Sequence, residues 1–181
     1  MADRMFLGIP LTPGGATELS RQLHSACPDG LPGREVPSGN WHLTLRFLGD
    51  VPADSAARLR GALGAGGLGK PFHVAFGAFG AFPDPRRARV LWAGVTDGSE
   101  PLGRLAEAVE GRVHRIGVPA EERPFSPHLT LARFREPQDV RPFLAATTPP
   151  DVDLPVREVV LFRSHLVGAA PRYEVIERFP L

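Results

Sequence analysis

Two stretches of this 181-residue chain share the tetrapeptide HLTL: WHLTLRFLGDV at Trp41–Val51 and SPHLTLARF at Ser126–Phe134. The composition predicts about 0.003 copies of this tetrapeptide in a chain of this length, so two copies indicate a repeat. Both stretches are rich in leucine, threonine and aromatic residues, which is typical of strands. We therefore predict that each copy lies on a β-strand.

The period of a strand decides where the side chains of each copy point. Successive side chains on a strand alternate between its two faces. The leucines therefore face a core, while His42 with Thr44, and His128 with Thr130, face the opposite side. If a two-fold axis relates the two strands, both His/Thr pairs meet in one cleft.

The segments around the two copies repeat one order of elements. Hydrophobic periodicity and turn residues predict strand, helix, strand, helix, strand in each half. The expected elements cover residues 4–11, 15–26, 41–48, 52–63 and 71–82, then residues 89–96, 101–116, 128–134, 137–146 and 156–166, with a final strand over 173–179. The two histidines are 86 residues apart and the two leading strands 85.

This repetition predicts an internal duplication with approximate two-fold symmetry. We expect an α+β fold in which two antiparallel sheets line a central cleft and helices pack outside. Residues 1–181 are expected to form one domain, with two lobes made from repeats of about residues 1–86 and 87–181.

Composition excludes several classes of protein. With 43% apolar and 23% charged residues, the chain can bury a core, and its 20 glycines and 20 prolines predict many turns. The net charge of +1 is too small for a protein that coats nucleic acid. No apolar run approaches the roughly 20 residues that span a bilayer, and no signal peptide is evident, so we expect no membrane association. The lone Cys27 excludes an internal disulfide and a four-cysteine zinc site, and we expect a cytoplasmic protein.

Two imidazoles and two hydroxyls in one cleft suit acid–base chemistry at phosphorus. Imidazole titrates near pH 6.5, so one ring can accept a proton while its twin donates one. The threonine hydroxyls can donate to the charged oxygens of the transition state. Two histidines without a third ligand make a poor metal site, and we expect no cofactor.

The extended motifs resemble the two H-x-T-x motifs of the two-histidine phosphoesterase superfamily. The particular similarity is to the bacterial and archaeal RNA 2′,3′-cyclic phosphodiesterases, also called 2′-5′ RNA ligases. It extends over the opening RMFLGIPL and the closing YEVIERFPL, and so over almost the whole chain.

The resemblance implies metal-independent hydrolysis of an RNA terminal 2′,3′-cyclic phosphate to a 2′-phosphate, with 2′-5′ ligation as the reverse reaction. It implies that His42 is the proton donor and His128 the proton acceptor, with Thr44 and Thr130 on the phosphate oxygens. The family arginine falls on Arg133, which strict alternation places on the leucine side, so that its role requires a bulge or a long reach.

Other functions remain open. A related activity could act on a small cyclic nucleotide or an ADP-ribose cyclic phosphate, and the cleft could bind nucleotides or RNA ends without turnover. The expected partner is RNA with a 2′,3′-cyclic phosphate end, with tRNA fragments as candidates, and the expected state is a monomer.

Several further residues are weaker candidates. Alternation places Arg46 on the His42 face, where it could bind a phosphate. Aromatic residues that could stack a terminal base are Trp41, Phe47 and Tyr173. The basic turn at residues 85–89 is expected to be solvated. The GxGxxG match at residues 64–69 follows a predicted helix, so the dinucleotide-binding interpretation fails, and the other histidines are assigned no chemistry.

Overall fold

The computed structural model describes residues 2–165 and 171–181 of the chain. The strands are β1 (Ala2–Pro10), β2 (Arg34–Glu35), β3 (His42–Pro52), β4 (Phe72–Phe82), β5 (Ala88–Asp97), β6 (His128–Gln138), β7 (Val152–Val156), β8 (Glu158–His165) and β9 (Arg172–Pro180). The helices are α1 (Pro13–Ala26), α2 (Ala53–Gly64), α3 (Ser99–Arg115) and α4 (Arg141–Ala146), with a 3₁₀ turn at Ser38–Asn40.

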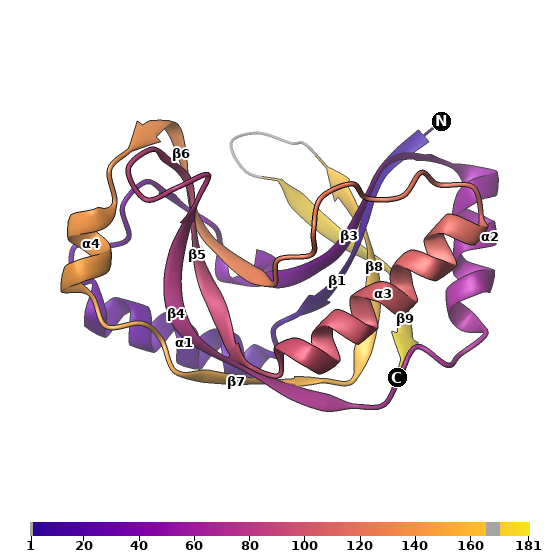
Figure 1. Ribbon diagram of the computed structural model, residues 1–181, viewed down its shortest axis with the longest axis horizontal. Coiled ribbons are helices and arrows are strands. Elements are labelled where there is room, and N and C mark those ends of the chain that lie inside the picture. The colour runs from indigo at the N-terminus through magenta and orange to yellow at the C-terminus, as the bar shows by residue number, and fades with distance from the viewer. Residues whose placement is uncertain (1, 166–170) are drawn as a thin grey trace.

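The strands form one curled antiparallel sheet in two halves. Their order is β7-β4-β5-β6-β3-β1-β8-β9, with β2 paired to β6 outside this path. The two HLTL strands, β3 and β6, join the halves through a single residue pair, Leu43 and Leu129. The predicted α+β fold with antiparallel strands is confirmed, and Figure 1 shows the two halves diverging from this junction.

Each half of the sheet takes strands from both halves of the chain. Strand β4, from the first repeat, pairs with β5 and β7, whereas β8, from the second repeat, pairs with β1 and β9. The two halves of the sheet therefore do not coincide with residues 1–86 and 87–181. The order of elements along the chain still repeats, and the duplication remains an interpretation of that repetition.

One predicted boundary is wrong and one strand was not predicted, each for an identifiable reason. The predicted helix over residues 137–146 begins only at Arg141, because β6 continues to Gln138, which pairs with Ala88. Strand β7 was not predicted, since Pro155 and Asp153 interrupt its pattern, yet it forms the edge of the sheet, where proline is tolerated.

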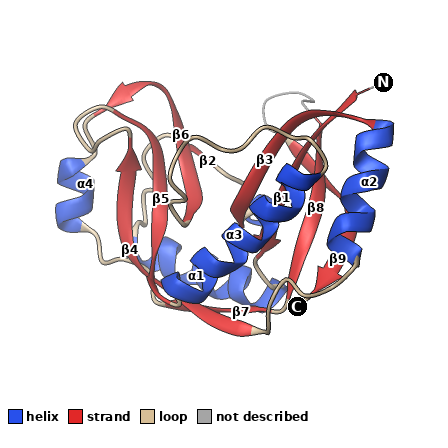
Figure 2. Ribbon diagram, turned by 45° about the vertical axis from the view of Figure 1, so that its right-hand side comes forward, coloured by secondary structure: helices blue, strands red, loops and turns tan. Residues whose placement is uncertain are grey.

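The core lies between the leucine face of the sheet and the helices. The HLTL leucines are buried in it together with apolar residues of α1, α2 and α3. Helix α3 packs on α2, β3 and β4, and α1 packs on β7. Helices α2 and α4 lie at opposite ends of the molecule (Figure 2). Among the described residues, no helix is both long enough and apolar enough to cross a membrane. This arrangement leaves the His/Thr face of β3 and β6 open.

Candidate active site

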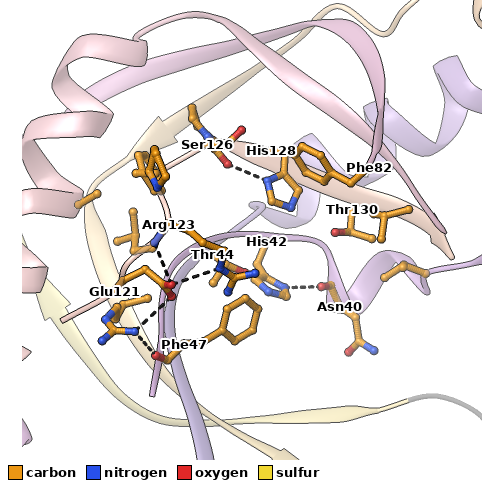
Figure 3. Close-up of a pocket in the computed structure, with 18 of the residues that line it drawn as sticks. Asn40, His42, Thr44, Phe47, Phe82, Glu121, Arg123, Ser126, His128 and Thr130 are labelled. Atoms are coloured by element: carbon orange, nitrogen blue, oxygen red, sulfur yellow. Dashed lines mark hydrogen bonds and ion pairs between the residues drawn. The ribbon is translucent and has the colours of Figure 1, made fainter. Parts of the chain in front are cut away.

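The two HLTL strands bring their histidines and threonines into one cavity. Its volume is about 1220 Å³, and His42, Thr44, His128 and Thr130 all line it. In Figure 3 the two imidazoles lie close together near the middle of the cavity. The structure thus places the four residues that alternation predicted to share a cleft in the same cavity.

A backbone carbonyl fixes the tautomer of each histidine. Nδ1 of His42 lies 2.7 Å from the carbonyl oxygen of Asn40, and Nδ1 of His128 lies 2.7 Å from that of Ser126. A carbonyl oxygen can only accept a hydrogen bond, so each Nδ1 carries the hydrogen. Each neutral ring therefore keeps an unprotonated Nε2, ready to accept a proton. The same contact, two residues back along the chain, occurs in both repeats (Figure 3).

Aromatic side chains surround both rings. The ring centroid of His42 lies 4.7 Å from that of Phe6 and 5.2 Å from that of Tyr173, and Phe82 lies 4.8 Å from His128. Burial among these rings lowers the pKa of His42 to about 4 and also lowers the pKa of His128. The charge of Arg133 lowers both pKa values further, whereas the carbonyl hydrogen bonds oppose the shift. Both imidazoles are therefore neutral at pH 7 when the cleft holds no anion.

Matching bulges in β3 and β6 change the alternation just after the threonines. On β3, Thr44 pairs with Gly8 but Arg46 pairs with Leu7, so Leu45 is an extra residue. On β6, Thr130 pairs with Trp92 but Ala132 pairs with Leu91, which makes Leu131 extra. An extra residue shifts the side chains that follow it to the opposite face, up to the next irregularity of the strand.

This shift places Arg133 on the cleft side, where it lines the cavity. The requirement for a bulge that the sequence posed for Arg133 is met by the one at Leu131. The equivalent position in the first repeat is Phe47, which also lines the cavity and is 53% exposed. The second repeat therefore gives the cavity a cation at this position and the first repeat gives it an exposed aromatic ring.

Arg46, which follows the bulge at Leu45, lines the cavity but is engaged with acidic residues. Its Nε lies 2.6 Å from a carboxylate oxygen of Glu110, and its Nη1 lies 3.4 Å from one of Glu121. It also donates to the carbonyl oxygens of Phe47 and Pro119, and its side chain is only 10% exposed. Arg46 thus holds the segment before β6, and its role in binding a phosphate stays a prediction.

The structure adds residues to the cleft that sequence reasoning missed. Phe82 lies against His128, and Glu121 with Arg123 borders the cavity from the segment before β6 (Figure 3). Arg34, on β2, also lines it. These residues come from turn-rich segments and a distant strand, whose placement depends on tertiary pairing, and the sequence carries no periodic signal for it.

The remaining aromatic and histidine side chains divide into those that line the cavity and those that do not. Trp41 is 7% exposed and belongs to the core, which is the more frequent position for an aromatic residue on a strand, so of the three aromatic candidates it is not one that could stack a base. Tyr173 is half-buried and lines the cavity beside His42. His165 lies 2.8 Å from Glu174 and outside the cavity. Over residues 2–165 and 171–181, no cluster of three histidine, cysteine or acidic side chains could hold a metal ion.

The curled antiparallel sheet and the paired H-x-T-x strands define a two-histidine phosphoesterase fold. A family model of the 2′-5′ RNA ligase superfamily matches residues 34–168. The chain belongs to this superfamily.

Individual relatives agree with this assignment. The chain is 30% identical over 186 residues to the RNA 2′,3′-cyclic phosphodiesterase of Methanothermobacter thermautotrophicus, with all of both chains covered. It is 34% identical over 184 residues to the protein of that name from Geobacillus stearothermophilus, covering 97% of this chain and 56% of the relative. The crystal structure of E. coli LigT complexed with 3′-AMP superposes with a TM-score of 0.83 at 27% identity, covering 100% and 99% of the two chains.

Proposed function

We propose that this protein hydrolyses the terminal 2′,3′-cyclic phosphate of RNA to a 2′-phosphate by general acid–base catalysis with His42 and His128. The single observation that carries the proposal is the pair of imidazoles in one cavity, each with Nδ1 on a backbone carbonyl and Nε2 available for proton transfer. The relatives named RNA 2′,3′-cyclic phosphodiesterase support the choice of substrate.

In the proposed reaction, water attacks the phosphorus atom and loses a proton to Nε2 of His128. The bond between phosphorus and the ribose 3′-oxygen breaks, and that oxygen takes a proton from Nε2 of His42. The phosphate stays on the 2′-oxygen. Thr44, Thr130 and Arg133 stabilise the negative charge on the non-bridging oxygens. The same sequence, with a 5′-hydroxyl in place of water, forms a bond between phosphorus and the 5′-oxygen while the bond to the 3′-oxygen breaks, which joins two RNA ends through a 2′-5′ linkage; its reverse cleaves that linkage and regenerates the cyclic phosphate.

His42 must be protonated to donate, although burial lowers its pKa to about 4. A phosphate anion within a few ångströms favours the charged imidazolium and raises this pKa. The empty cleft therefore holds two neutral bases, and the substrate supplies the charge that lets His42 take up a proton.

The direct test uses an RNA oligonucleotide that ends in a 2′,3′-cyclic phosphate. H42A and H128A should each lower kcat by about 10²–10⁴-fold, the usual contribution of a positioned acid or base. H114A is the matched control, because His114 is exposed on α3 and lies outside the cavity. The product must be a 2′-phosphate. Turnover near that of the wild type in either active-site variant, with circular dichroism unchanged, contradicts the mechanism.

Two alternative functions give different results in the same assay. An enzyme for small cyclic nucleotides turns over a mononucleotide faster than a capped oligonucleotide. A non-catalytic module binds the RNA end and releases no product. The presence of both histidines in mirrored environments favours catalysis.

We further propose that the protein acts as a monomer in the cytoplasm and that tRNA fragments with cyclic phosphate ends are among its substrates. One chain supplies both histidines, so the cleft needs no partner subunit. Gel filtration of the active enzyme tests the monomer.

A further inference from the structure

His42 takes its orientation from a turn that is attached to the rest of the protein at a second point. Asn40 ends the 3₁₀ turn at Ser38–Asn40, and its backbone carbonyl accepts the hydrogen bond from Nδ1 of His42 (Figure 3). The Nδ2 of the Asn40 side chain donates a hydrogen bond of 2.7 Å to the carbonyl oxygen of Pro171, 131 residues further along the chain. A carbonyl oxygen only accepts, so the amide nitrogen of Asn40 must face it.

This second attachment reaches the edge of the sheet. Pro171 immediately precedes β9, which is the edge strand of its half, and β1 and β8 separate β9 from β3. The hydrogen bond from Asn40 therefore joins the turn before β3 to a strand that does not pair with β3. The bond is partly buried, so losing the amide would leave the Pro171 carbonyl without a partner where water reaches it poorly.

Strand β9 carries Tyr173, which forms one wall of the surroundings of His42. The Tyr173 ring stands at 88° to the imidazole, with the two centroids 5.2 Å apart. It also contacts Phe6 at 4.9 Å, and Phe6 lies 4.7 Å from His42. Tyr173 is only two residues beyond Pro171, so the attachment point of the Asn40 amide lies next to this wall. One side chain thus connects both supports of the imidazole, the carbonyl on Nδ1 and the aromatic wall.

The second repeat has no counterpart of this attachment. The residue in place of Asn40 is Ser126, whose backbone carbonyl accepts the hydrogen bond from Nδ1 of His128. Within residues 2–165 and 171–181, the Ser126 hydroxyl makes no hydrogen bond. The segment before β6 is held instead by the ion pairs of Arg46. The amide of Asn40 therefore serves the first histidine alone.

We propose that Asn40 is a positioning residue for His42. Its side-chain amide holds the start of β9, and with it the Tyr173 ring, against the imidazole, and it fixes the backbone carbonyl that orients Nδ1. A catalytic group must stay within about 0.5 Å of its productive position, and these two supports together hold Nε2 of His42 in place. The inference rests on the proposed function, in which His42 is the proton donor, and it adds a residue that acts through that histidine.

The test uses N40A, which removes the amide and keeps the backbone carbonyl. Tyr173 is the only tyrosine of the chain, so NMR can follow its ring directly, and the nuclear Overhauser effect (NOE) between the Tyr173 and His42 rings should weaken in N40A. Burial is the largest cause of the low pKa of His42, so in the free variant this pKa should rise from about 4 by about one unit, while that of His128 stays unchanged. With the cyclic-phosphate RNA, kcat should fall about five- to tenfold, the effect of one net hydrogen bond, with little change in KM.

S38A is the matched control, because Ser38 is exposed in the same turn and lies outside the cavity. Its NOE, pKa values and turnover should equal those of the wild type. N40D has nearly the shape of asparagine but no amide donor, so it should lose the NOE as well.

Three results would overturn the inference: a retained NOE in N40A or N40D, an equal pKa shift of both histidines in N40A, or a loss of the NOE in S38A. A fall in kcat without the NMR changes also overturns it. If the wild type does not hydrolyse the RNA, the proposed function fails, whereas the NMR measurements still decide whether Asn40 positions His42.

Discussion

Replacing Arg46 with methionine should destabilise the protein well beyond the effect of an ordinary surface ion pair. The side chain of Arg46 is 10% exposed and holds Glu110, Glu121 and two backbone carbonyls. Removing one partner of a fully buried pair costs about 3–5 kcal/mol, because the other charge stays buried. Here the two glutamates keep about 30% exposure and can rehydrate in part. We therefore expect the free energy of unfolding to fall by about 2–3 kcal/mol.

Urea unfolding of R46M measures this quantity directly. A protein of this length should lose about 2–4 °C in Tm for each kcal/mol, which gives a decrease of about 4–12 °C. Turnover should fall as well, because the segment that Arg46 holds carries Ser126, whose carbonyl orients His128. R46M should therefore lower kcat more than it raises KM.

R60M provides the matched control. Arg60 also forms an arginine–glutamate pair, with Glu177, but its side chain is 52% exposed. Exposed pairs contribute about 0–1 kcal/mol, so R60M should be nearly neutral in both stability and turnover. If R46M destabilises the protein no more than R60M does, burial is not what makes the Arg46 cluster important, and the reasoning is refuted.

Three further predictions concern the same molecule. A Cβ on Gly80 would lie 2.1 Å from the Trp92 ring beside His128, so G80A should lower the free energy of unfolding by about 1–3 kcal/mol and lower turnover. Gly111 on α3 faces open space, so G111A should raise the free energy of unfolding by about 0.4–1 kcal/mol. Urea unfolding of both variants measures these changes. The folded pKa of His42, about 4, lies below its unfolded value, so the unfolded state binds the proton first as the pH falls. The contribution of His42 to the free energy of unfolding is fully present above about pH 6.5 and falls by about 3 kcal/mol toward pH 4. H42Q has no imidazole to titrate, so its free energy of unfolding should depend less on pH over that range. R133Q should raise the pKa of both histidines in the free protein, because its charge lowers them, and an NMR titration that finds them unchanged would contradict this electrostatic coupling.

The central part of the site could be predicted from the sequence because it depends on local periodicity. Alternation within HLTL is a property of the strand itself, so His42, Thr44, His128 and Thr130 point as predicted. The prediction failed one or two residues later. The bulges at Leu45 and Leu131 changed the alternation from which the positions of Arg46 and Arg133 were predicted, and the leucines at these positions show no sign of a bulge in a single sequence.

Features that depend on pairing between segments far apart in the chain could not be predicted from the sequence either. Arg34 enters the cleft through a two-residue strand in a segment rich in glycine and proline, which predicts only a loop. The element order was repetitive, as predicted, but repetition along the chain cannot say which strands become neighbours. The exchange of β4 and β8 between the two halves of the sheet follows from tertiary pairing alone.

The placement of strands from both halves of the chain in each half-sheet has a consequence for folding during synthesis. Strand β1 pairs with β8, so that Met5 lies opposite Arg163. During synthesis from the N-terminus at roughly 5–20 residues per second, β1 waits about 8–30 s for this partner to leave the ribosome. For that time the first half-sheet presents an unpaired edge. Neither half of the chain can complete a half-sheet by itself, so fragments divided near residue 86 should acquire structure only when they are mixed.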